Sequence, residues 1–311
     1  MLLRRESRFQ KGKVFDGHIS LVTRSNKMQK IEPILYFRNS NKSLTTDKSM
    51  NVKPPREHVI TRGTDTFFIG LYDAFKFFLR FFKEVLRPPY EIKEIIRQCY
   101  EIGVNSLPLI SLTGFITGLV FTKQSRPSLA EFGATSWLPS LVAIAIIKAL
   151  APLVTALIAA GKVGSNIGAE IGSMKVTEQI DAMEVSAINP YKFLVVSRVL
   201  ATTFMIPMLT FYTGGVAMYG AFLNVHTNEM TSFVAFFEQA FSKIDFLDIA
   251  TSVVKAIAYG FTIGIVGCYK GYHATSGTEG VGRAANSSVV ISMFLIFVEE
   301  ILIVQVANAI K

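Results

Sequence analysis

The residues best suited to chemistry are ionisable side chains that lie inside long apolar stretches of the sequence. They are Lys148, Lys255, Glu299 and Glu300. A charge in the hydrocarbon part of a bilayer costs about 3 kcal/mol on insertion-based scales, so such a residue faces a partner, a cavity or a bound ligand. We expect Lys148, near the middle of its stretch, to face inward and to pair with Glu299 or Glu300, or to meet an anionic lipid headgroup. Lys255 could equally extend its side chain to the membrane interface.

Glycines at intervals of four form a second set of candidate residues. On a helix this spacing leaves one face without side chains, so another backbone can approach closely. Two groups have the spacing: Gly114 and Gly118 in one apolar stretch, and Gly164, Gly168 and Gly172 at the start of the polar segment Ala160–Pro190. We expect close helix packing at both groups.

The second half of the segment Ala160–Pro190 has the pattern of a short amphipathic helix. Its apolar positions are Val176, Ile180, Met183 and Ala187, and its polar positions are Glu178, Gln179, Asp181 and Glu184. Asn189-Pro190 is a typical end for such a helix. Two interpretations are open: a solvated connection between two spans, or a helix that a partner protein grips.

The elements that must position these residues are helices, because five apolar stretches have about the length that a bilayer requires. They cover residues 104–122, 138–160, 199–225, 247–269 and 289–310. Half of all residues are hydrophobic. The predicted fold is an all-α integral membrane protein with five transmembrane helices. We also expect a polar loop over residues 123–136 and a partly amphipathic external helix over residues 227–248.

Residues 65–87, before the first span, combine phenylalanines at helical spacing with interrupting charges. This pattern predicts an amphipathic helix that lies in the membrane interface. A second short cytoplasmic helix is expected over residues 90–100. Together with the spans, these elements form one predicted membrane domain over residues 63–311.

The N-terminal residues 1–62 carry the net charge of the chain. They contain 14 Lys and Arg against 5 Asp and Glu, which accounts for the whole formal charge of +9. We expect a mostly disordered basic extension, or a true start nearer Met50. Lys and Arg are more frequent in the loops on the side of this tail, so the N-terminus and the segment Ala160–Pro190 are predicted to be cytoplasmic.

Several kinds of chemistry have no counterpart in the sequence. Cys99, Cys268 and the four histidines show neither a disulfide framework nor metal-ligand spacing. No Walker A, HExxH or GxSxG motif occurs, so we expect no metal, no cofactor and no ATP site in this chain. Because the basic charge is confined to a tail, no nucleic-acid partner is expected. The chain is predicted not to be an enzyme.

Two long segments resemble one family of membrane proteins. EIGSMKVTEQIDAMEVSAINP, extended at its start by GKVGSNIGAEIGSM, and the later GYHATSGTEGVGRAAN are similar to the MlaE/YrbE-type permeases. These are the membrane subunits of ABC transporters that move phospholipids or other hydrophobic lipids across Gram-negative and plastid envelopes. The resemblance extends from about Arg87 to the C-terminus and implies an MlaE-type permease domain in the inner membrane.

The resemblance also implies partners and roles. It implies a homodimer, two ATPase subunits that bind the ATP, an MCE-domain lipid-binding protein outside, and lipid in a cavity at the dimer interface. It makes the amphipathic segment a cytoplasmic coupling helix, with ATPase-coupling candidates Glu170, Lys175, Glu178, Gln179, Asp181, Met183 and Glu184. The lipid-pathway candidates are Lys148, Glu299 and Glu300. Where the family often has Arg-Glu-Leu-Gly-Pro, this chain keeps a base at Lys148 but has Ala149 in place of the acid.

Two other classes of function remain open from the residues alone. An ion-coupled secondary transporter would use Lys148 with Glu299 or Glu300 as a relay, but such transporters often contain internal repeats, and none is found. A membrane-embedded lipid enzyme would need catalytic polar residues clustered at one depth, and only scattered ones occur.

A bracing or capping carboxylate is the alternative role for Glu170.

Overall fold

The computed structural model describes residues 59–88, 90–275 and 277–310, and most of the tail predicted over residues 1–62 therefore lies outside the described part. The described residues form helices and no strand, which confirms the all-α prediction. The order is α1 (Val59–Val85), α2 (Ile92–Glu131), η1 (Thr135–Trp137), α3 (Leu138–Ala145), η2 (Ile146–Leu150), α4 (Ala151–Ala159), η3 (Ala160–Gly164), α5 (Ser165–Val176), α6 (Gln179–Val185), η4 (Tyr191–Val196), α7 (Ser197–Glu229), α8 (Phe233–Phe241), α9 (Phe246–Tyr272) and α10 (Gly277–Ile310).

Five of the described helical segments are long and apolar enough to cross a membrane, as the sequence predicts. They are Ile92–Glu131, Thr135–Val176, Tyr191–Glu229, Phe246–Tyr272 and Gly277–Ala309. The second comprises α3, α4 and α5 with η2 and η3 between them, and the third begins with η4.

Two expectations about the ends of these helices are wrong. The predicted helix over residues 90–100 and most of the predicted loop over residues 123–136 belong to one continuous helix, α2, which also contains Pro108 and Pro127. The predicted external helix over residues 227–248 is divided among the end of α7, the separate helix α8 and the start of α9. The reason is mutual support: at the extended ends of α2 and α7, Arg126 donates to Asn228 at 3.2 Å and contacts Glu229 at 3.5 Å.

The second span contains π-helical turns, and Pro152 explains the position of the first. Proline has no N–H to donate to the carbonyl four residues earlier, which here belongs to Lys148. That carbonyl accepts a hydrogen bond from the Lys255 ammonium at 3.2 Å, and the π-helical turn η2 ends directly before α4. A local irregularity of the backbone thus exposes a polar atom to a charged residue of another span.

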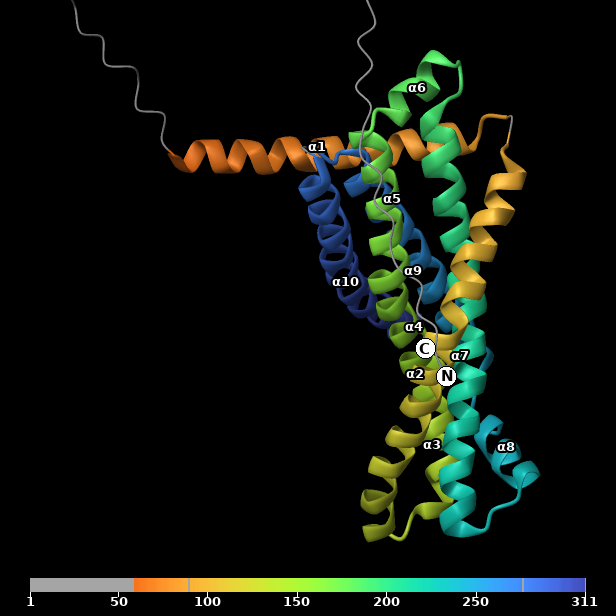
Figure 1. Cartoon of the computed structure of the whole chain (residues 1–311). Helices are drawn as coiled ribbons and strands as arrows, with labels where there is room; N and C mark the ends of the chain where they lie inside the picture. Colours follow the sequence, from red (N-terminus) through yellow and green to blue (C-terminus); the bar gives the residue numbers. More distant parts are fainter. Residues whose placement is uncertain (1–58, 89, 276, 311) are drawn as a thin grey trace, which may run out of the picture. The chain divides into compact units, whose positions relative to one another are not determined.

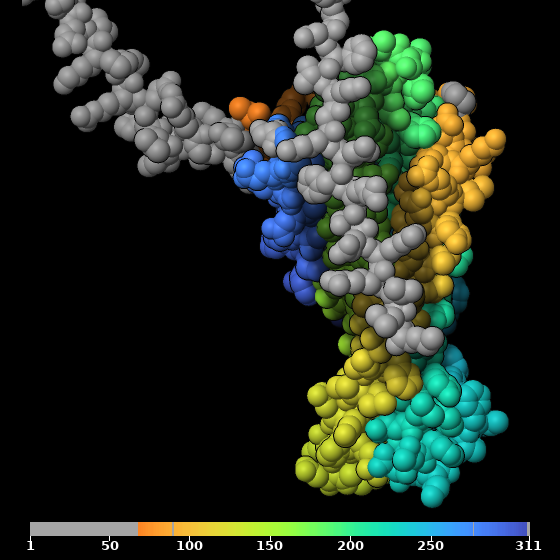
Figure 2. Space-filling model, viewed as in Figure 1, coloured from red at the N-terminus to blue at the C-terminus, as the bar shows by residue number. Residues whose placement is uncertain are grey.

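Glycines allow the helices to approach closely. A Cβ atom at Gly118 would lie 1.9 Å from the Ala217 carbonyl oxygen, and one at Gly114 would lie 3.1 Å from a Thr213 methyl group. The α2 and α7 backbones therefore touch directly at Gly118. In Figure 2 the far ends of α2 and α3 lie beside α7 and α8, and the α2–α7 and α3–α8 pairs are in contact.

The glycines of α5 and of the turn before it face α10 and the loop that precedes α10. A Cβ atom at Gly168 would meet the Ala284 carbonyl oxygen and the Ala285 Cα atom, both at 3.3 Å. At Gly172 the nearest atom is the Ala274 methyl group at 3.3 Å, and at Gly164 the Ser288 hydroxyl lies 3.5 Å away and donates to the Gly164 carbonyl.

Helix α1 lies across the end of the bundle at which α6 is also found, and α8 lies at the opposite end (Figure 1). The Tyr191 hydroxyl donates to the Phe77 carbonyl at 2.6 Å and thereby fixes α1 to the start of the third span. Phe77 and Phe81 are buried, whereas Phe68, Tyr72 and Phe75 are more than half exposed. The described part of α1 therefore has one packed edge and a wide exposed aromatic surface.

Candidate functional site

The predicted coupling segment consists of two helices at the α1 end of the bundle. Helix α6 covers seven residues and is shorter than the predicted Val176–Ala187. Left-handed backbone at Glu178 and Ala187, both with φ +60°, marks its two ends. Because non-glycine residues seldom adopt this conformation, the surrounding packing must hold both turns in place.

One side of α6 is anchored and the other is free. Ile180 is buried, and Met183 packs against the same core. The remaining predicted coupling residues of this helix and its N-cap are exposed, and they are Glu178, Gln179, Asp181 and Glu184. Val185 is 90% exposed, although the sequence pattern did not single it out. The exposed side of α6 thus offers acids around an apolar residue, a composition that suits a partner surface with basic groups.

Two ion pairs connect this segment to the helices that cross the membrane. The Lys175 ammonium lies 2.9 Å from the Asp181 carboxylate, and both side chains are substantially exposed. The Arg198 guanidinium lies 2.7 Å from the Glu170 carboxylate and also donates to the Leu194 carbonyl at 3.1 Å. Arg198 is almost fully buried. Glu170 therefore lies in a brace between α5 and α7, apart from the exposed acids of α6.

The charges inside the spans pair differently from the sequence-based expectation. Lys148 lies 3.3 Å from Asp248, not against Glu299 or Glu300. Asp248 stands in the first turn of α9, and its burial at 5% exposure makes a cationic partner necessary. Sequence reasoning missed Asp248 because it lies at the edge of an apolar stretch, where a carboxylate is ordinarily solvated.

A second buried cluster joins α9 to α10. The Lys255 ammonium lies 2.6 Å from the Glu300 carboxylate, whose other oxygen accepts from the Tyr259 hydroxyl. Thr262 donates to Glu299, whose second oxygen has no hydrogen-bond partner among the described residues. Lys255 is 1% exposed, so the interpretation in which it extends to the membrane interface is wrong. Its depth and its two oxygen partners make it part of the helix packing.

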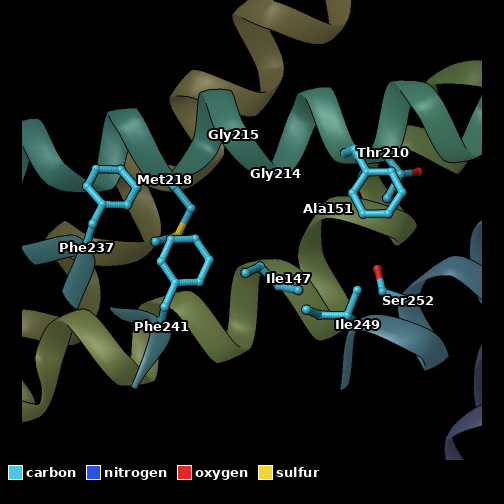
Figure 3. Close-up of a pocket in the computed structure, with 11 residues that line it drawn as sticks. Ile147, Ala151, Thr210, Gly214, Gly215, Met218, Phe237, Phe241, Ile249 and Ser252 are labelled. Atoms are coloured by element: carbon cyan, nitrogen blue, oxygen red, sulfur yellow. The ribbon is translucent and has the colours of Figure 1, made fainter. Parts of the chain in front are cut away.

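An apolar pocket lies between α7, α8, α9 and the η2–α4 segment, beside the Lys148–Asp248 pair. It has a volume of about 280 Å³ and is lined by Ile147 and Ile249, the chain neighbours of that pair, and by Thr210, Met218, Phe237 and Phe241, among others. In Figure 3 the Met218 side chain reaches toward the Phe241 ring, and Ser252 and Thr210 supply the hydroxyl groups among the sticks. Such a pocket suits an apolar chain better than a polar solute.

Among the described residues, no group of three His, Cys, Asp or Glu side chains could hold a metal ion. Within the same residues, Cys99 and Cys268 are free thiols. What the arrangement provides is an apolar pocket beside an ion pair, a buried charged cluster and an exposed acidic helix at one end.

Comparison with known proteins gives one consistent answer. The family model described as permease MlaE matches residues 95–306. A probable ABC transporter permease protein of Rickettsia typhi is 34% identical over 238 residues, which cover 76% of this chain and 91% of that protein. One from Synechocystis is 31% identical over 70% of this chain and 82% of its own length. The chloroplastic protein TRIGALACTOSYLDIACYLGLYCEROL 1 of Arabidopsis thaliana is 28% identical, covering 70% and 62%.

Proposed function

This chain belongs to the MlaE permease family of ABC transporters, and we propose that it moves phospholipid or another hydrophobic lipid between the inner membrane and a periplasmic carrier. As an ABC transporter permease it is a multi-pass membrane subunit and not itself an enzyme, and it works with an ATPase. Membership of this family is better supported than the two other classes of function that the sequence left open, an ion-coupled secondary transporter and a membrane-embedded lipid enzyme.

The apolar pocket beside the Lys148–Asp248 pair is the observation that carries the lipid proposal. A lipid has an apolar chain and a polar headgroup. The pocket offers an apolar lining, in which Ile147 and Ile249 are the chain neighbours of the Lys148–Asp248 pair. The Lys148 side chain is 29% exposed, and in this proposal its ammonium binds an anionic headgroup. The printed name of the Arabidopsis relative includes that of a glycolipid, trigalactosyldiacylglycerol. This agrees with the proposal that the transported molecule is a lipid.

The proposed assembly rests on the resemblance to the family and on the exposed side of α6. Two copies of the chain form a homodimer, an MCE-domain protein receives or delivers the lipid, and the ATPase binds the exposed side of α6. This arrangement places α1 and α6 on the cytoplasmic side of the inner membrane, with the basic N-terminus on that side too, as the distribution of Lys and Arg favours. The exposed aromatic residues of α1 then lie in the membrane interface.

The test is ATP-dependent lipid transfer by the complete complex in proteoliposomes. Gly214 lines the pocket, and a Cβ atom there would have its nearest neighbour, Ala151, at 3.8 Å. Gly214→Leu fills the pocket, so we expect the amount of co-purified lipid and the rate of transfer to fall together. Gly282→Leu is the matched control, because Gly282 is exposed and has open space around it. Transfer at the wild-type rate in Gly214→Leu contradicts the lipid pocket.

A further inference from the structure

A second candidate site lies far from the pocket of Figure 3, at the α1 end of the seam between α9 and α10. An apolar groove of about 640 Å³ runs between α1, α9 and α10, with Ala74, Val266, Ile291 and Phe294 among its lining residues. In Figure 1 the first part of α10 lies next to α1. The size of the groove is in the range of about 300–1,000 Å³ that is typical of ligand sites in proteins.

A polar cavity adjoins this groove. It has a volume of about 290 Å³ and includes Lys270, His273, Arg283 and Ser287 in its lining. Tyr269 and Lys270 line both spaces, so the two are neighbours, one polar at the α1 end and the other apolar along the α9–α10 seam. This division is the one that an amphiphilic molecule in a bilayer requires.

The charges at the polar end favour an anion. No carboxylate of the described residues forms an ion pair with Lys270, whose ammonium lies 5.6 Å from the Tyr269 ring centroid. Arg283 contacts Glu279 at 3.8 Å, but both side chains are largely exposed, so the attraction is weak and easily replaced. Asp73 of α1, an acid near Tyr269, is also exposed. Two cationic side chains in the lining of one polar cavity are suited to a phosphate group.

We propose that this composite site binds one anionic phospholipid from the bilayer leaflet at the α1 end, with its phosphate at Lys270 and Arg283 and an acyl chain in the groove. Tyr269, which lines both parts, donates from its hydroxyl to the Gly70 carbonyl at 3.4 Å, so a lipid at this position also fills the space beside α1. The bound lipid is a ligand that holds α1 against the bundle, and its binding does not depend on which molecule is transported.

The experiment is native mass spectrometry of the purified full chain in detergent, with added phosphatidylglycerol or phosphatidylcholine. We expect tighter binding of phosphatidylglycerol, and we expect Lys270→Ala and Arg283→Ala each to weaken it about fivefold. Lys76→Ala is the matched control, because Lys76 lies on α1 at the same end, is exposed and lines neither space. An equal loss in this control, or no loss in the combined Lys270→Ala/Arg283→Ala variant, overturns the proposal.

A second variant tests the apolar half without altering a charge. A Cβ atom at Gly70 has nothing within 4 Å, so Gly70→Leu projects into the groove without striking the protein. We expect Gly70→Leu to weaken the binding of both lipids at least about fivefold, whereas Gly282→Leu leaves the binding of both unchanged. A groove covered by a second copy is the other outcome: if Phe294→Cys forms a disulfide between two copies, the proposal is overturned. None of these measurements uses the ATPase, so failure of lipid transfer leaves them unaffected.

Discussion

The Arg198 guanidinium lies 2.7 Å from the Glu170 carboxylate, and the two residues differ sharply in exposure. The Arg198 side chain is 2% exposed and the Glu170 side chain is 35% exposed. The pair joins α5, which leads to the exposed helix α6, to α7, which packs against both α2 and α9. We propose that this contact transmits movement of α6, the helix expected to bind the ATPase, to α7 in the bundle.

The unequal burial of this pair predicts unequal effects of removing either partner. Glu170→Ala leaves a buried guanidinium without its counter-ion and should lower the stability by about 3 kcal/mol, whereas Arg198→Met leaves only a partly hydrated carboxylate and should cost about 1 kcal/mol. Thermal unfolding in detergent, followed by fluorescence, measures both. Equal losses in the two variants contradict the brace.

The sequence predicted the helical class and the five membrane-crossing helices because length and apolar composition determine both. It could not predict where helices end outside the bilayer, since those ends depend on contacts between helices such as Arg126 with Asn228. A pattern in one helix carries no information about the partner that another helix supplies.

The same limit explains the mistaken charge pairs. Lys148 and Glu300 are both conspicuous in apolar stretches, but their partners, Asp248 and Lys255, are decided by depth and by the π-helical turn before Pro152. The sequence located the exposed acids of α6, because amphipathic spacing is a local property. Arg198 comes directly before the apolar stretch 199–225, where the sequence pattern gives no sign of burial, and its burial depends on how α7 packs.

Reversing charge on α6 should separate the permease from its ATPase. Glu178→Lys with Asp181→Lys places two cations on the exposed side of the helix and removes the Lys175–Asp181 pair, which as an exposed pair is worth at most about 1 kcal/mol. The permease should therefore remain folded while co-purified ATPase falls at least about tenfold. Glu279→Lys, an exposed acid outside α6, should leave the ATPase bound. Wild-type co-purification in the double variant excludes this surface.

Adding a single methyl group at Gly118 should disrupt packing between α2 and α7. The new Cβ atom would lie 1.9 Å from the Ala217 carbonyl oxygen, which as a backbone atom cannot move aside without shifting α7. Gly118→Ala should cost about 1–3 kcal/mol, the usual range for overpacking. Gly215→Ala, with nothing within 4 Å of the new atom, should be neutral or slightly stabilising. The measurement is the midpoint of thermal unfolding in the same detergent.

The buried cluster of α9 and α10 permits the most demanding prediction, because its members can be removed singly and together. Lys255→Met leaves the Glu300 carboxylate, 17% exposed, without its cation 2.6 Å away, and should lower the stability by about 3–5 kcal/mol. Lys148→Met should also be costly, because it removes the ammonium that lies 3.3 Å from the Asp248 carboxylate, and that side chain is only 7% exposed.

The second substitution distinguishes loss of a pair from loss of packing. In the Lys255→Met/Glu300→Gln variant no charge is left unpaired, and the amide oxygen of glutamine still accepts from Tyr259, so most of the lost stability should return. Glu299→Gln, next in the chain but bonded to Thr262, is the matched control and should restore nothing to Lys255→Met. Equal recovery with either glutamine would mean that the net charge of α10, rather than the contact between Lys255 and Glu300, determines the stability.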